Sequence, residues 1–393
     1  MLSVGFVAID VDQKWMGGRY YLQHLIRCVA ALPAAERVQM HDVWWQRMAV
    51  PDPFAEVRLP LGEPITVAAP TSLIDRLKRK LRRIRDRTPG SSDLFDAAGI
   101  DLFFPIPPCD NSGTTYVFWL PDFQYLRRPD LMSESLRAAL ETYFCDHVHA
   151  AAQIVLSSTE AQRDFAEVYP HLLHRTHVVR FCSVPDEMWW RLEPAQVADK
   201  YLLPERFLIV CNQFTRHKNH LTLFDALRIL VARERSDIHL VCTGSTFDHR
   251  QEDFIGRANE FLHRHSLESR VHILGLIPRA DQVALIRRSV AVMQPSWFEG
   301  WSTIIEDAKT LGKPVLASDL PVHHEQLGPL HAYYLSLDSA EEWADAIESV
   351  WSKCLAGPDT EAEAAGLVRL QAARRECGLA FVKALRAALP GNE

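Results

Sequence analysis

The acidic residues of one segment are the first candidates for chemistry. From Pro295 to Asp319 the chain reads PSWFEGWSTIIEDAKTLGKPVLASD, with Glu299 in a loop after an apolar run and Glu306 and Asp307 inside a helical pattern. A carboxylate in such a loop can accept hydrogen bonds from sugar hydroxyls, while the free N–H groups of the first helical turn can face a phosphate. Glu299 has no competing structural role, so we expect it to contact a ligand.

The same segment carries the signals of a helix start and a helix end. Thr303 and Glu306 have the spacing of a capping box, which places Thr303 at the N-cap and returns the Glu306 carboxylate to it. Gly312 then ends the helix, and Lys313-Pro314 begins the next strand. This gives Glu306 a structural explanation that competes with a role in binding.

A basic cluster follows an apolar strand in the middle of the chain. The stretch CNQFTRHKNHLTLF puts Arg216, His217 and Lys218 in a loop that opens a helix at about Asn219. Open α/β sheets bind ligands at the carboxyl ends of their strands, and cationic side chains suit phosphate. A solvated basic turn is the competing explanation, and the presence of three such groups favours a binding site over it.

Two adjacent glycines, Gly17 and Gly18, join the first strand to the first helix. Glycine lets backbone N–H groups approach an anion at a helix N-terminus, where the helix dipole also favours negative charge. The GxGxxG fingerprint of dinucleotide-binding folds is absent, and a tight turn explains the two glycines equally well.

Short apolar runs alternate with helical patterns along the chain, which predicts an α/β fold with parallel, doubly wound sheets. The alternation forms two series of similar size, and 393 residues exceed one ordinary core. We therefore expect two Rossmann-like domains that face each other across a cleft, with a connector at residues 190–204. The predicted limits are residues 1–190, residues 191–365, and residues 366–393 for the end of a last helix that docks back on either domain.

The composition is that of a soluble globular protein, with 48% apolar and 24% charged residues. The net charge of −7 argues against general nucleic-acid binding. Eight cysteines are scattered without a CxxC pair, so we expect buried free thiols in a reducing cytoplasm. The amino-terminal run reads as a strand, and no run reaches the roughly 20 apolar residues of a membrane span, so we expect a cytoplasmic protein.

The most basic stretch is SLIDRLKRKLRRIRDR, residues 72–87, with Leu73, Leu77, Leu81 and Ile84 on one helical face. A basic amphipathic helix can lie on anionic lipid, or it can attract a lipid-diphosphate acceptor. The alternative is a helix that packs one face on the first domain and keeps its charges solvated. Contact with the inner face of the membrane is slightly favoured because the rest of the chain is acidic.

Taken in order, these motifs resemble glycosyltransferase family 4. The stretch FEGWSTIIEDAKTLGKPVLASDLPVHHEQ resembles the E-x7-E segment of that family, and MGGRYY, WLPDFQYL, NQFTRHKNH and GLIP stand in the family's order. The resemblance implies the GT-B fold and a retaining, metal-independent transfer of a hexose from a nucleotide-diphosphate sugar. It also implies a glycan or lipid-linked acceptor in surface polysaccharide or glycoconjugate synthesis, and it leaves the base, the sugar and the linkage open.

The resemblance assigns roles to three of the charged residues. Glu299 matches the glutamate that contacts the donor sugar, and Lys218 matches the lysine that neutralises the donor diphosphate. Asp307 matches the acid that binds the ribose hydroxyls, which makes the motif E-x7-D in this chain. Glu306 is a rival for the ribose role.

Backbone groups of the donor site are implied in the same way. Gly300 and the amides of Ser302 and Thr303 match the helix start that faces the diphosphate, where they stabilise charge on the leaving oxygens. Gly17-Gly18 match a loop near the donor phosphate.

The chain also departs from the family pattern. Gln213 stands where the family has an arginine near the diphosphate, and Arg216 is the expected substitute. Asp122 matches the acid of a histidine–aspartate pair, but Pro121 stands in the place of the histidine. A mechanism that uses that histidine is therefore excluded for this chain.

Two other functions remain open from the sequence. One is a different enzyme on the same fold, such as a sugar-nucleotide epimerase or a phosphorylase. The other is a catalytically silent scaffold that binds glycan or membrane, as the departures from the family suggest. The histidine pairs HVH (147 and 149) and HH (323 and 324) lack a clear third ligand, so no metal is expected.

Overall fold

The computed structural model describes residues 1–8, 16–45, 54, 57–61, 65–67, 99–108, 114–247, 254–328, 330 and 332–389. The basic stretch 72–87, expected above to contact a membrane or an acceptor, lies outside these residues.

The first half of the chain forms two parallel sheets that are joined by one bridge. The strand orders are β3-β2-β1-β4 and β5-β6-β7, and all pairings are parallel. A parallel bridge between Phe103 and Tyr116 links the two sheets. The strands are β1 (Ser3–Val7), β2 (Gln39–Trp45), β3 (Ile65–Val67), β4 (Leu102–Phe104), β5 (Val117–Leu120), β6 (Gln153–Leu156) and β7 (Thr176–Val178).

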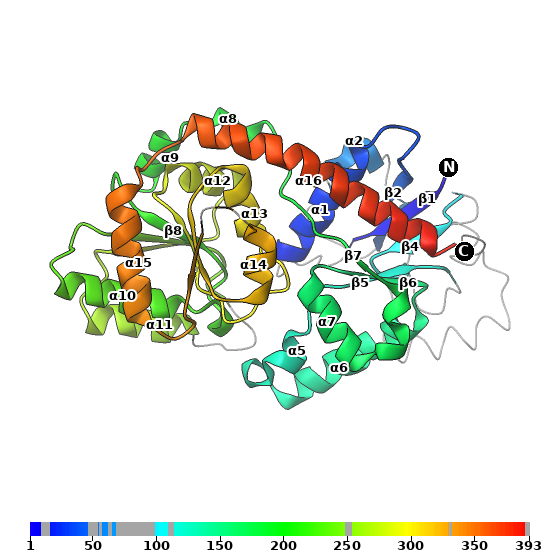
Figure 1. Ribbon diagram of the computed structural model, residues 1–393, viewed down its shortest axis with the longest axis horizontal. Helices are drawn as coiled ribbons and strands as arrows, with labels where there is room; N and C mark the ends of the chain where they lie inside the picture. Colours follow the sequence, from blue (N-terminus) through cyan, green and yellow to red (C-terminus); the bar gives the residue numbers. More distant parts are fainter. Residues whose placement is uncertain are drawn as a thin grey trace.

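Helices pack on both sides of these strands, and α6 and α7 lie on the side of β5–β7 that faces away from the last helix (Figure 1). The amino-terminal caps of α6 and α7 are Ser133 and Ser158, whose hydroxyls accept from the backbone N–H groups of Leu136 and Ala161. The helices of this half are α1 (Met16–Ala30), α2 (Arg58–Leu61), α5 (Gln124–Arg127), η2 (Pro129–Leu131), α6 (Glu134–Ala150), α7 (Thr159–Val168) and η3 (Pro170–Arg175).

The second half forms one six-stranded parallel sheet with the order β10-β9-β8-β11-β12-β13. The order reverses between β8 and β11, and parallel sheets open a crevice for ligands at the carboxyl ends of the strands at such a point. The strands are β8 (Leu208–Cys211), β9 (Leu240–Thr243), β10 (Val271–Gly275), β11 (Val292–Gln294), β12 (Val315–Ser318) and β13 (Ala332–Leu335).

The inner strands β8, β9, β11 and β12 are buried on both faces because helices cover each face. Leu208 and Val210 of β8 point into one apolar cluster, and Ile209 between them points into the cluster on the opposite face. The helices are α8 (Met188–Arg191), α9 (Pro194–Lys200), η4 (Arg216–Lys218), α10 (His220–Ala232), α11 (Phe254–Arg264), α12 (Arg279–Arg288), α13 (Thr303–Thr310), α14 (Pro321–Leu327) and α15 (Ala340–Lys353).

The predicted architecture of two Rossmann-like halves with parallel sheets is confirmed. Residues 190–204, expected to be a connector, hold the second half of α8 and all of α9, and Val197 and Ala198 pack into the core of the second half. The predicted domain limits at 190 and 365 stay predictions.

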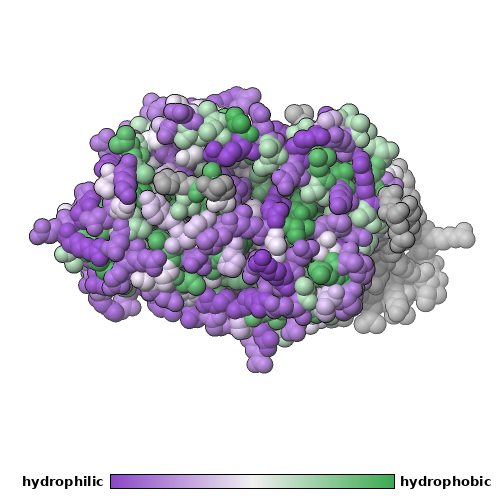
Figure 2. Space-filling model, in the orientation of Figure 1, coloured by the Kyte–Doolittle hydropathy of each residue, from purple (hydrophilic) through white to green (hydrophobic). Residues whose placement is uncertain are grey.

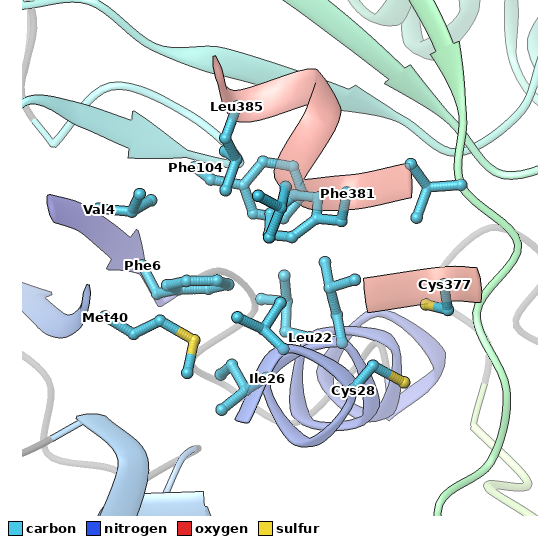
Figure 3. Packing of buried hydrophobic residues seen from close by; sticks show 14 of the residues in the cluster. Val4, Phe6, Leu22, Ile26, Cys28, Met40, Phe104, Cys377, Phe381 and Leu385 are labelled. Atoms are coloured by element: carbon cyan, nitrogen blue, oxygen red, sulfur yellow. The ribbon is translucent and has the colours of Figure 1, made fainter. Parts of the chain in front are cut away.

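The last helix, α16 (Thr360–Ala387), crosses from the second half of the chain to the first (Figure 1). Near its start it packs on α13, and near its end it packs on α1. Phe381 lies against Phe104 and Phe6, with ring centroids 4.7 and 6.0 Å away, inside the apolar cluster of the first half (Figure 3). The helix therefore ties the two halves together through buried apolar contacts.

The face of the molecule shown in Figure 2 is mostly hydrophilic, with apolar residues in small groups. The cysteines that the structure describes are all free thiols, and Cys28, Cys182, Cys242 and Cys377 are buried. None of the described helices combines the length and the apolar character that a membrane span requires.

Candidate active site

A cavity of about 1100 Å³ is lined by both halves of the chain. In the second half, its lining follows the carboxyl ends of β8, β9, β10 and β11, which are the edge of the sheet that the strand order marks as a ligand site. In the first half, its lining comes from α1, from β5 and the residues after it, from the segment that spans α5 to α6, and from Ser157 and Phe181 after β6 and β7. Among the lining residues are Gly17, Tyr20, Trp119, Asp122, Gln213, Lys218, Arg279, Glu299, Gly300, Ser302, Thr303 and Asp307.

Lys218 and Glu299 form an ion pair in this cavity. The Lys218 Nζ atom lies 2.6 Å from Glu299 Oε1, and the side chains are 18% and 8% exposed. Lys218 ends the η4 turn after β8, whereas Glu299 lies in the loop after β11. The two residues that sequence reasoning assigned to the donor sugar and its diphosphate are therefore neighbours at the point where the strand order reverses.

Two hydrogen bonds hold the loop of Glu299 against the turn of Lys218, and a third ties that turn to the loop after β13. The Asn219 amide Nδ2 donates to the carbonyl oxygens of Pro295 and Leu337, each at 3.1 Å. The Trp297 N–H donates to the His217 carbonyl at 2.8 Å. Asn219 has a left-handed backbone conformation (φ 55°), which asparagine tolerates better than most residues. The pair is thus positioned before any ligand arrives.

A second layer of amide side chains supports Glu299. Gln294, the last residue of β11, donates from Nε2 to Glu299 Oε1 at 2.6 Å. Its own Oε1 accepts from Asn212 Nδ2 at 3.0 Å, at the end of the adjacent strand β8. The carboxylate therefore has a fixed direction that is set by two strand ends.

The electrostatic environment keeps Glu299 ionised. Burial alone would raise the pKa of Glu299, but the charge and hydrogen bond of Lys218 outweigh burial, and the pKa lies below its ordinary value. Nearby His323 is buried, which lowers the pKa of its imidazole, and its Nδ1 donates to the Ser318 carbonyl at 2.8 Å. Glu299 is therefore an acceptor of hydrogen bonds at neutral pH, beside a neutral histidine.

The start of α13 differs from the sequence prediction. Ser302, and not Thr303, is the N-cap, and its hydroxyl accepts from the Ile305 N–H at 3.4 Å. The Ser302 N–H donates to Gln326 Oε1 at 3.1 Å, and Gln326 Nε2 donates to the Ser302 carbonyl at 2.7 Å. In this structure Gln326 occupies the Ser302 N–H, and the expectation that this amide binds an anion stays a prediction. Thr303, the first helical residue, lines the cavity.

The structure separates the roles of the two acids inside α13. Glu306 is not among the described residues that line the cavity, and its Oε1 accepts from Lys309 Nζ and Gln326 Nε2, both at 2.9 Å. It does not return to the N-cap as a capping box would require, because Gln326 holds it. Asp307 lines the cavity, and its Oδ1 accepts from Arg279 Nη2 at 2.6 Å.

Arg279 is a cavity residue that sequence reasoning missed. It begins α12, directly after the GLIP stretch at the end of β10, and its guanidinium lies over the rings of Tyr20 and Trp189 at 5.0 and 5.2 Å. Burial raises the pKa of Asp307, and the charge of Arg279 partly offsets this rise. The sequence signal for Arg279 was its position after a strand of the parallel sheet, because ligands bind at such strand ends.

The expected substitute cation, Arg216, points elsewhere. Its Nη1 donates to the Asp130 carbonyl at 3.3 Å, and its guanidinium lies 5.8 Å from the Trp297 ring centroid. Arg216 is not among the described residues that line the cavity, whereas Gln213 is. In the described part of the chain, the second cation at the cavity is therefore Arg279.

Asp122 and Gly300 meet across the cavity. A Cβ atom on Gly300 would lie 2.7 Å from the Pro121 carbonyl oxygen and 2.8 Å from Asp122 Cβ, so only glycine fits between the two domains at this point. Asp122 Oδ1 accepts from the Gln124 N–H at 2.8 Å. Gly17 and Gly18 lie in the first turn of α1; Gly17 lines the cavity and Gly18 is buried.

The histidine pairs do not assemble into a recognisable metal site. Within the described residues, no group of three or more histidine, cysteine, aspartate or glutamate side chains has a metal-binding arrangement. The expectation of a metal-free reaction stays a prediction.

Comparison with known proteins identifies a family match in the second half of the chain. The family model described as glycosyl transferases group 1 matches residues 198–354. That range contains η4 with Lys218, the loop of Glu299, and α13.

Solved structures resemble the whole chain at low identity. Anabaena HepE, solved with UDP and glucose, is 17% identical with a TM-score of 0.66, and the match covers 98% of each chain. A glycosyltransferase from Rickettsia africae is 14% identical with a TM-score of 0.63, over 98% of this chain and 97% of that one. WaaG, a glycosyltransferase involved in lipopolysaccharide biosynthesis, is 14% identical with a TM-score of 0.59, over 99% and 100%. The chain therefore has the GT-B fold, and its residues 198–354 match the family of glycosyl transferases group 1.

Proposed function

We propose that the protein is a retaining glycosyltransferase that moves a hexose from a nucleoside-diphosphate sugar to an acceptor hydroxyl. The observation that carries this proposal is the Lys218–Glu299 pair, which lies in the cavity between the domains and within the segment that matches glycosyl transferases group 1. UDP is the proposed nucleotide, because the similar Anabaena HepE has been solved with UDP and with UDP-glucose.

The donor would lie along the second domain. Lys218 would neutralise the diphosphate together with the N–H of Thr303 at the start of α13, where the helix dipole favours negative charge. Asp307 would accept from the ribose hydroxyls, since it lines the cavity and Glu306 is held by Lys309 and Gln326. Glu299 would accept from the hydroxyls of the transferred sugar.

The reaction breaks the bond between the anomeric carbon and the diphosphate oxygen, and the electron pair goes to that oxygen. Lys218 stabilises the charge that develops there, and such electrostatic stabilisation in a water-poor site is usually the largest single term in catalysis. The acceptor hydroxyl attacks the anomeric carbon from the same face, and its proton passes to the departing phosphate. Asp122, across the cavity beside Gly300, would orient the acceptor.

This chemistry needs neither a bound metal nor a pair of catalytic carboxylates. We propose that it takes place in the cytoplasm and builds a surface polysaccharide or another glycoconjugate.

A donor-consumption assay tests the proposal. We expect UDP-glucose, in the presence of EDTA, to yield UDP and an acceptor-linked product, with the anomeric configuration of the donor kept in the product's NMR coupling constants. Lys218→Ala should lower kcat/KM by about tenfold to a hundredfold, because a charge-assisted contact to the leaving group is lost. Donor turnover that needs no acceptor, or an unchanged rate in Lys218→Ala, would contradict the proposal.

A further inference from the structure

One wall of the cavity is mostly apolar. The lining residues contributed by the segment from α5 to α6 are Gln124 and a group of five apolar or aromatic side chains. We call this group the apolar lobe; it consists of Tyr125, Met132, Leu136, Leu140 and Phe144. It continues the wall that begins at Asp122, so it opens onto the site of the proposed transfer.

The apolar lobe follows from the sequence of α6. Leu136, Leu140 and Phe144 are spaced four residues apart and share one helical face. Val148 continues the row and is fully buried, and the Phe144 ring lies 6.2 Å from Phe118 of β5. The carboxyl end of the row thus belongs to the core, while its amino end forms cavity wall. Leu136, at the amino end of the row, belongs to none of the described apolar clusters, so it is not needed to hold the helix on the sheet.

The cavity has room for a second substrate. Its volume of about 1100 Å³ exceeds the roughly 300–1,000 Å³ of pockets that hold one small ligand. The proposed donor contacts, Lys218, Glu299 and Asp307, all belong to the second domain. The space beside the apolar lobe is therefore left for the acceptor.

We propose that the apolar lobe holds a hydrocarbon chain attached to the acceptor, so that the acceptor is a lipid-linked sugar and not the free end of a polysaccharide. This inference rests on the proposed glycosyl transfer. Sugar hydroxyls placed against the side chains of Met132, Leu136, Leu140 and Phe144 would lose their water without gaining strong hydrogen-bond partners, which is unfavourable. A hydrocarbon chain in the same place leaves water and gains free energy with each methylene group that is buried.

Alkyl glucosides of increasing chain length test the inference directly. Methyl, butyl, hexyl and octyl β-glucoside share one sugar and differ only in the chain. Titrated calorimetrically into the full-length protein below micelle-forming concentrations, they should bind about fourfold more tightly per added methylene until the lobe is full. Equal affinity across the series, or no measurable binding of octyl glucoside, would overturn the inference.

A pair of α6 variants locates the effect. Leu136 lines the cavity and belongs to none of the four described apolar cores, so Leu136→Asp should fold and should lose the dependence on chain length. Ala139→Asp adds the same charge at an exposed position of the same helix and should keep it. A chain-length dependence that survives in Leu136→Asp, or that disappears in both variants, would also overturn the inference.

Titrations with UDP separate this inference from the proposed function. Each glucoside series is measured with and without UDP, and UDP alone is titrated into all three proteins. UDP should bind the two α6 variants as it binds the wild type, because its contacts lie in the second domain. Failure of UDP to bind the wild type would refute the proposed function. The glucoside series measured without UDP would still show whether the apolar lobe binds a hydrocarbon chain.

Discussion

At the scale of single residues, the site depends on positions that follow strand ends. Lys218 and Glu299 are predictable from sequence because each stands after an apolar strand, in a loop with no competing structural task. Arg279 has the same placement, but a lone arginine gives no sign that its side chain will turn to Asp307. The role of Gln326 could not be predicted, because Gln326 and Ser302 are 24 positions apart in the chain and belong to two different helices.

His220 beside the site should make the protein sensitive to acid. It is fully buried, 4.1 Å from the Phe214 ring centroid, and burial together with the charge of Lys218 lowers its pKa from 6.5 to about 3. Between these two values the unfolded state binds more protons than the folded state, so the free energy of unfolding falls as the pH is lowered.

From pH 7 to pH 5 this single group should remove about 2 kcal/mol. Urea unfolding at both pH values measures the loss in the wild type and in His220→Phe, which keeps an aromatic ring and cannot titrate. The variant should lose less stability by about that amount. An equal loss in the two proteins would show that His220 is protonated in the folded state as readily as in the unfolded chain.

At the scale of elements, the hydrophobic pattern of the sequence predicts the strands and the helix that carry the site. The runs of β8 and β11 and the helical spacing of α13 are strong signals, and Gly312 ends the helix region with a left-handed φ of 63°, as expected. The hydrophobic pattern does not predict β2 or β13. In β2 the run QMHDVWW has polar residues inside it, and the AYYL of β13 is too short to stand out from a loop. Their pairing partners make them strands.

The crossing of α16 over α13 depends on a glycine. A Cβ atom on Gly366 would lie 2.2 Å from the Thr310 carbonyl oxygen and 2.8 Å from that of Lys309, which are rigid backbone atoms. Gly366→Ala should therefore lower the free energy of unfolding by about 1–3 kcal/mol, although alanine is the better helix former.

Val368→Ala, at an exposed position on the same helix, is the matched control and should change stability by less than about 0.5 kcal/mol. Thermal or urea unfolding of the two variants is the measurement. A Gly366→Ala protein as stable as the wild type would mean that the two helices can separate without cost.

At the scale of the whole molecule, charged contacts across the cleft join the two domains. Glu325 of α14 accepts from the Thr159 N–H at 2.9 Å and from Arg180 Nε at 2.5 Å, so it satisfies the first free N–H of α7 in the first domain from the second. Trp301 Nε1 donates to the Phe181 carbonyl at 3.0 Å, also across the cleft. Such polar contacts between domains usually permit opening and closing.

Glu325→Gln should shift the equilibrium between the closed and the open arrangement of the domains toward the open one. The variant keeps the shape of the side chain and loses the charge-assisted bonds, which are worth about 1.5–3 kcal/mol when they involve a charged group. We expect a larger radius of gyration by small-angle X-ray scattering for the unliganded protein. Glu341→Gln, on the exposed first turn of α15, should leave the radius unchanged. An equal radius of gyration in both variants and the wild type would show that the Glu325 contacts do not hold the two domains together.

The most direct test of the central claim is a calorimetric titration of UDP into the full-length protein and into Lys218→Met. The account predicts that UDP binds the wild type and that Lys218→Met weakens binding by about tenfold to a hundredfold, because a cation beside the diphosphate is removed. Lys353→Met, which removes a charge from the end of α15, should bind UDP as the wild type does. Equal affinity of the wild type and Lys218→Met for UDP would contradict the account, because the diphosphate would then lie away from the Lys218–Glu299 pair.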